Sequence, residues 1–141
     1  ETAMLPAEPR ARATARALSR FHDSRIEPVL RAYFGQIAPA NRDADFIRDN
    51  ASLLQKRMQQ LAQMVTPHPF LCGDILSLAD CGFAPSFAIL NRLQTILGFT
   101  VDLPDGLRAY EAALASHPSV TDELQGYYDA LGSWAEAKLK S

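Results

Sequence analysis

Apolar residues recur at spacings of three and four along most of the chain, which is the repeat of an amphipathic helix. The spacing predicts one long helix from Pro9 to Ala38. Pro28 lies inside this segment and lacks a backbone N–H, so we expect a kink there. A second helix is predicted from Phe46 to Val65. Only a short break separates the two helices, which should therefore pack as an antiparallel hairpin.

The rest of the chain shows the same repeat in shorter pieces. A third helix is predicted over residues 77–97, interrupted by Pro85 and ended by Gly98. A fourth follows residues 104–106 and ends at 117–118, and Ser119 is expected to cap a last helix before a frayed tail. No segment alternates with a period of two residues. The sequence therefore predicts an all-α helical bundle in which residues 1–141 form a single domain.

The composition is that of a globular protein, with 48% apolar and 21% charged residues among 141. The net charge of −2 disfavours nucleic acid as a partner, because phosphate binding needs a clustered excess of Lys and Arg. The longest apolar run, residues 83–90, is far shorter than the roughly 20 residues that span a bilayer, so we expect no membrane segment. Two cysteines are too few for a disulfide scaffold, which favours a reducing, cytoplasmic compartment.

The most informative motif is Phe-Leu-Cys-Gly-Asp-Ile-Leu-Ser-Leu-Ala-Asp over residues 70–80. Gly73 permits a tight turn, and Ser77 is placed to cap the helix that follows. Asp80 lies three residues later, where its carboxylate can accept a hydrogen bond from the Ser77 backbone N–H, as in a capping box. A catalytic carboxylate is the alternative interpretation of Asp80, and capping is favoured because the helix dipole stabilises a negative charge at this end.

This motif resembles the start of the central helix in the C-terminal, all-helical domain of the cytosolic glutathione transferases. Residues 4–13, 107–110 and 117–120 resemble other segments of that domain, so the resemblance covers essentially the whole chain. It implies that the chain is a fragment of a two-domain protein. The family's thioredoxin-like domain supplies the catalytic Tyr, Ser or Cys and most of the glutathione contacts, and no βαβ pattern of that kind is present here.

The resemblance also implies roles for individual residues. Phe34 and Ile37 are expected to form walls of a pocket for a hydrophobic electrophile, and Trp134 is expected to cap it. Glu27 is expected to reach the amino group of glutathione across a homodimer. From the residues alone, Glu27 is one member of a solvated ladder of ion pairs on the first helix. The ladder comprises Arg16, Arg20, Asp23, Glu27 and Arg31.

Other candidate groups point to packing. Cys72 and Cys81 are expected to be small packing residues, with Cys81 at a buried position of the third helix. The three histidines, His22, His68 and His117, share no metal-ligand spacing, so we expect no metal site.

The leading functional hypothesis is therefore the electrophile-site and dimer-interface half of a glutathione transferase, with glutathione as co-substrate of the full-length protein. This half alone is expected to contain no catalytic residue and to bind no cofactor. The alternatives are a non-catalytic interaction module and a ligand-storage domain of the same fold. A catalytic residue and a Val-Pro loop upstream of Glu1 would favour the enzyme.

Overall fold

The computed structural model describes residues 4–141, and its regular structure is helical, as predicted. The first helical stretch runs from Pro9 to Gln36 in four consecutive pieces. These are the α-helix α1 (Pro9–Phe21), a π-helical turn (His22–Ile26), the α-helix α2 (Glu27–Ala32) and a 3₁₀ turn (Tyr33–Gln36). The remaining long helices are α3 (Ala44–Met64), α4 (Phe83–Leu97), α5 (Asp105–Ser116) and α6 (Pro118–Leu139).

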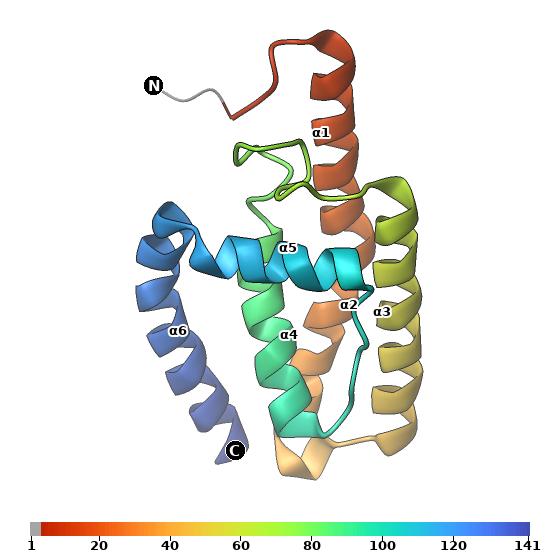
Figure 1. The fold of residues 1–141 in the computed structure, drawn as a ribbon. Helices are drawn as coiled ribbons and strands as arrows, with labels where there is room; N and C mark the ends of the chain where they lie inside the picture. Colours follow the sequence, from red (N-terminus) through yellow and green to blue (C-terminus); the bar gives the residue numbers. More distant parts are fainter. Residues whose placement is uncertain (1–3) are drawn as a thin grey trace.

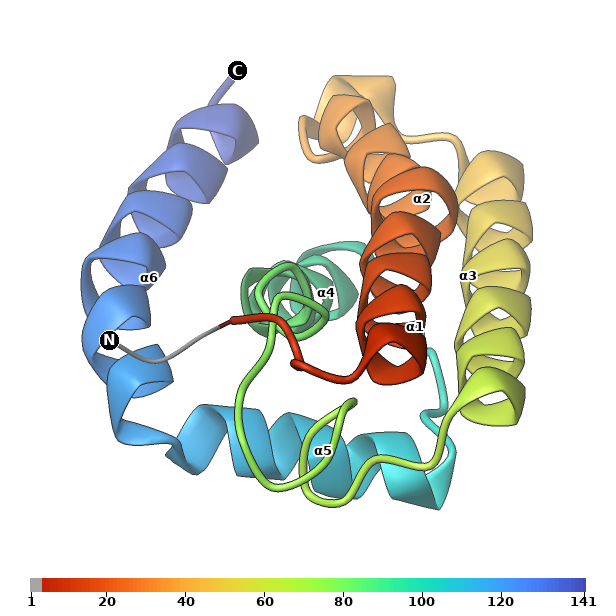
Figure 2. The ribbon, with the colours of Figure 1, turned by 90° about the horizontal axis from the view of Figure 1, so that it is seen from above.

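Helix α4 stands at the centre of the bundle (Figure 1). Seen from above, α1, α2 and α3 lie on one side of it and α6 lies on the other, while α5 runs across a third side (Figure 2). The α1–α2 segment and α3 run side by side in both views, so the predicted hairpin is present.

The irregularity expected at Pro28 takes the form of the π-helical turn just before it. The backbone N–H of Glu27 donates to the carbonyl of His22, five residues back, which is one residue more than in an α-helix. Pro28 then occupies the first turn of α2, where its missing N–H costs little. The extra residue breaks the 3.6-residue repeat, so Arg16 and Arg20 form no ion pair with Asp23 or Glu27 among the described residues.

The predicted start of the third helix is wrong by about six residues. Helix α4 begins at Phe83, and residues 78–82 form turns instead. Pro85 explains the difference, because it has no N–H to donate to the carbonyl of Cys81 and its ring would crowd that carbonyl. Cys81 is consequently exposed, whereas the sequence had placed it at a buried helical position. Gly98 ends α4 with φ of 73°, as expected for a left-handed cap.

The last helix differs from the prediction at both ends. His117, and not Ser119, is the N-cap residue of α6, and Pro118 takes the first helical position. Trp134 lies inside this helix, which continues to Leu139, so the frayed tail expected around it is absent. Its position within a regular helix fixes which way the indole can point.

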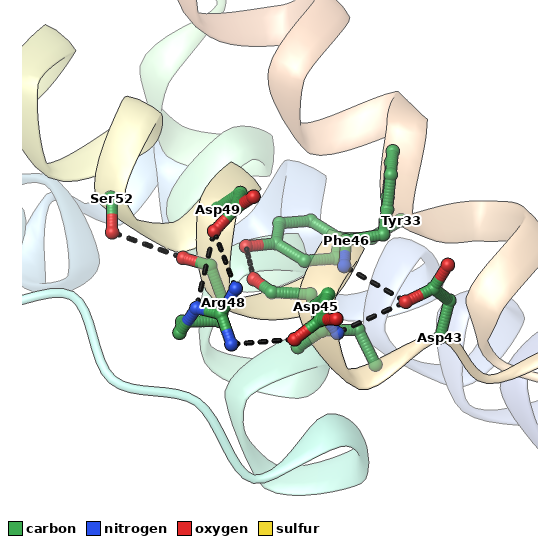
Figure 3. A network of polar contacts seen from close by, with 8 residues as sticks. Tyr33, Asp43, Asp45, Phe46, Arg48, Asp49 and Ser52 are labelled. Atoms are coloured by element: carbon green, nitrogen blue, oxygen red, sulfur yellow. Dashed lines mark hydrogen bonds and ion pairs between the residues drawn. The ribbon is translucent and has the colours of Figure 1, made fainter.

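The core lies between α4 and the α1–α2 segment on one side and α3 and α5 on the other. Tyr33 is fully buried there and stacks on Phe99 with 4.5 Å between ring centroids. At the start of α3, the Asp43 carboxylate caps the helix by accepting from the backbone N–H groups of Asp45 and Phe46 (Figure 3). Arg48 forms ion pairs with Asp45 and Asp49 on the exposed side of this turn.

Candidate functional site

A cleft of about 570 Å³ lies between the α1–α2 segment, the start of α4 and the middle of α6. Its volume falls within the range of small-molecule sites, and its walls are mostly apolar. Phe34 and Trp134 meet across it edge to face, with 4.8 Å between ring centroids, although 100 residues separate them in the chain. The structure therefore brings two of the three predicted pocket residues together. Other apolar wall residues are Leu30, Ile89 and Leu131.

Ile37, the third predicted pocket residue, does not line this cleft. Its side chain is fully buried in the core. The prediction assumed that an α-helix continued to Ala38, but the chain tightens into a 3₁₀ turn at Tyr33–Gln36 and the direction of the following side chains changes. Ile37 is a packing residue.

Glu27 lies in the wall of the same cleft and forms an ion pair with Arg31, one helical turn further on. Its Oε1 accepts from Nη2 of Arg31 at 2.7 Å and from Nε at 2.8 Å. The guanidinium of Arg31 also lies 5.9 Å from the centroid of the Phe34 ring. This partly exposed ion pair therefore lies beside the Phe34 ring, and the contact of Glu27 with glutathione stays a prediction.

A polar cluster of His22, Asp23 and Ser86 in the same wall escaped the sequence analysis. His22 is 5% exposed, and its Nδ1 lies 2.9 Å from Oδ1 of Asp23. Its Nε2 lies 2.8 Å from Oγ of Ser86, which is 64 residues away in the chain and also buried. All three residues line the cleft. Gly82 leaves the room for the imidazole, because a Cβ there would lie 2.5 Å from the ring.

Local signals could not reveal this cluster. Its His and Ser come from helices that meet only in the folded protein, and the orientation of the ring depends on the π-helical turn that begins at His22. Isolated π turns inside helices often occur at functional sites, but their sequences carry no distinctive repeat.

Tyr127 adds a hydroxyl to the cleft from the side of α6. Burial raises the pKa of this phenol above its ordinary value, and the nearby Arg31 only partly opposes that effect. The hydroxyl is therefore protonated at neutral pH and able to donate a hydrogen bond.

Ser77 and Asp80 lie in a separate buried network at the turn before α4. Asp80 Oδ2 accepts from the backbone N–H of Ser77 at 2.8 Å, which is the reach-back contact of the predicted motif. Its Oδ1 accepts from the backbone N–H of Leu71 at 3.0 Å and from the hydroxyl of Tyr110 at 2.9 Å. The carboxylate thus joins the turn, the preceding loop and α5, which is the arrangement of a structural group.

Cys81 lies beside this network and lines a neighbouring groove of about 500 Å³. Although the residue is exposed, its thiol is partly desolvated by its neighbours, which raises its pKa, and the negative charge of Asp80 adds to the shift. The thiol is therefore protonated at neutral pH and a poor nucleophile. Cys72 and Cys81 are both free.

Two further findings apply to residues 4–141. They contain no group of three or more His, Cys, Asp or Glu placed to hold a metal ion. None of their helices is both long enough and apolar enough to cross a bilayer. Comparison of the chain with known protein-family models and with curated protein sequences gave no match.

Proposed function

We propose that this chain is the electrophile-binding, all-helical domain of a protein like the cytosolic glutathione transferases. The observation that carries the proposal is the cleft walled by Phe34 and Trp134, with Glu27 at its edge. The resemblance predicts Phe34, Ile37 and Trp134 as walls of one pocket, and Glu27 as a separate contact to glutathione across a homodimer. The meeting of Phe34 and Trp134 in an apolar cleft of suitable volume supports the predicted pocket.

The apolar character of the cleft suits it to electrophile binding and leaves activation of glutathione to another domain. Its walls are apolar and aromatic, so they remove the hydrophobic part of an electrophile from water. Activation of the glutathione thiol would come from a thioredoxin-like domain of the full-length protein. In a homodimer, the carboxylate of Glu27 would exchange Arg31 for the amino group of glutathione from the partner subunit.

The single tryptophan of the chain provides a direct test. A halogenated nitrobenzene, used as the electrophile probe, should quench Trp134 fluorescence in a saturable manner when it enters the cleft. Phe34→Ala should weaken binding about tenfold, because it removes an aromatic wall worth about 1 kcal/mol beyond its buried area. Tyr128→Ala changes an exposed aromatic residue on α6 outside the cleft and serves as the matched control.

The same probe separates the possible functions. Saturable quenching together with glutathione-dependent turnover by the full-length protein supports the transferase. Quenching without turnover indicates ligand storage. Absence of quenching, or equal affinities for the Phe34 and Tyr128 variants, would show that the cleft is not the electrophile site.

A further inference from the structure

The strongest unexplained feature of the cleft is the chain of hydrogen bonds through Asp23, His22 and Ser86. In a neutral imidazole, one ring nitrogen donates and the other accepts. Asp23 can only accept, so the Nδ1 of His22 that lies 2.9 Å from its carboxylate must carry the proton. Nε2 is then free to accept a proton, and the Oγ of Ser86 lies 2.8 Å from it. This is the order of groups that activates a serine as a nucleophile.

Neighbouring residues restrain the His22 ring in this arrangement. The imidazole is confined between Gly82 and the ring of Phe83, whose centroid lies 4.8 Å away. Ser86 lies in the first two turns of α4, and its backbone N–H donates to the carbonyl of Gly82 at 3.3 Å. Both residues are buried and both line the cleft, so a molecule bound there would lie beside the His22–Ser86 pair.

We propose that Ser86 is a nucleophile for acyl transfer, with His22 as its general base and Asp23 as a positioning residue. The substrate class is an ester of an apolar carboxylic acid, because the walls beside Ser86 are apolar and aromatic. All three groups belong to this chain, so the activity requires no glutathione and goes beyond the proposed transferase function.

The reaction proceeds in two balanced steps. The Oγ of Ser86 attacks the ester carbonyl carbon while Nε2 of His22 takes the hydroxyl proton; the bond to the alcohol oxygen breaks, and that oxygen receives the proton from Nε2. Water then gives a proton to Nε2 and attacks the acyl-serine, releasing the acid, and Nε2 returns the proton to Ser86. The sum is ester plus water giving acid plus alcohol, with no oxidation or reduction.

Asp23 distinguishes this site from the most efficient serine hydrolases. Its side chain is 57% exposed, so water screens its interaction with the imidazole. We therefore expect slow turnover and an acyl-enzyme that accumulates. Tyr127 is the candidate donor to the oxyanion, because its protonated hydroxyl belongs to the same cleft.

The test treats the chain, without glutathione, with p-nitrophenyl hexanoate and separately with an alkyl fluorophosphonate. We expect a burst of p-nitrophenol and a covalent adduct on Ser86 by peptide mass spectrometry. Ser86→Ala should abolish both, whereas Ser24→Ala, which changes an exposed serine next to Asp23, should change neither. An adduct on another residue, or an undiminished burst in Ser86→Ala, would overturn the proposal.

The two partners of the serine give separate readouts. His22→Gln should lower the rate constant of labelling at least about 100-fold. Asp23→Asn lies at an exposed position and should fold, so it remains informative if His22→Gln does not. It should lower the labelling rate constant about tenfold without changing the apparent affinity for the fluorophosphonate, because it acts through the imidazole. A rate constant that is unchanged in Asp23→Asn would show that these hydrogen bonds only join the π-helical turn to α4.

Discussion

Gly82 has no side chain, and the imidazole of His22 occupies the space that a Cβ would take. An ideal Cβ at this position would lie 2.5 Å from two atoms of the ring, which is itself buried. We therefore expect Gly82→Ala to cost about 1–3 kcal/mol, because the ring must leave its place or α4 must shift. Gly132→Ala is the matched control: it lies in α6 with open space around it and should stabilise by about 0.5–1 kcal/mol. Urea unfolding distinguishes them, and equal effects would contradict the close approach.

Asp80 is expected to be a determinant of stability and not of catalysis. Its carboxylate is 2% exposed and serves the backbone N–H groups of Leu71 and Ser77 and the hydroxyl of Tyr110. Asp80→Ala leaves these donors buried without partners, so we expect a loss of ~3 kcal/mol or more. Ser77→Ala removes a buried hydroxyl that donates to Asp80 Oδ2 and accepts from the backbone N–H of Ala79, so it should cost about 1–2 kcal/mol.

The two measurements for Asp80 are the melting temperature and, in the full-length protein, glutathione turnover per folded molecule. A lower melting temperature with near-normal turnover is the expected result. Unchanged stability with lost turnover would assign Asp80 to catalysis instead.

Tyr110 makes this network sensitive to alkaline pH. Burial, and then the negative charge of Asp80, raise the pKa of its phenol well above the ordinary value of 10.0. In the unfolded chain Tyr110 loses its proton near that ordinary value, while in the folded chain it keeps it. Its contribution is therefore fully present below pH 10 and is lost as the pH rises above that value. The stability of Tyr110→Phe should decline less between pH 9 and pH 11 in denaturant titrations; an equal decline would contradict this assignment.

The stability of helix α3 depends on the hydrogen bonds that cap its first turn. Asp43 accepts hydrogen bonds from the backbone N–H groups of Asp45 and Phe46, both at 3.0 Å, and satisfies donors that the helix itself cannot. Asp43→Ala should therefore cost about 1 kcal/mol. Asp45→Ala breaks only an exposed ion pair with Arg48 and should cost less than about 0.5 kcal/mol. Thermal melts of both variants provide the comparison, and the reverse order would show that the ion pairs dominate.

The elements that the sequence predicted well are those whose signals are local. Helix α3 ends before Thr66-Pro67, and α4 ends at Gly98, because Pro and Gly act on the backbone wherever they occur. The starts of α4 and α6 were predicted at Ser77 and Ser119 because both residues are good caps. In each case a proline moved the boundary, and the serine side chain could not compensate.

The cleft could be predicted only in part, because local sequence signals do not show which helices meet in the folded chain. Phe34 and Trp134 could be assigned to one pocket through a resemblance that covers the whole chain. Ile37 was placed wrongly because no local pattern signals the change from α-helix to 3₁₀ turn at Tyr33. The pairing of His22 with Ser86 joins two helices, so it depends on the packed structure.

The arrangement of the whole chain limits what it can bind by itself. Glutathione carries two carboxylates and an ammonium group, and each needs a charged or hydrogen-bonding partner when it leaves water. The cleft offers mostly apolar walls, and its main charges, Glu27 and Arg31, already pair with each other. We therefore expect isothermal titration calorimetry of this chain to detect no saturable binding of glutathione at millimolar concentrations, and transferase assays to detect no turnover. An apolar electrophile should still quench Trp134 in the same sample, which shows that the cleft is intact. Saturable binding of glutathione would mean that the helical domain alone contains a peptide site.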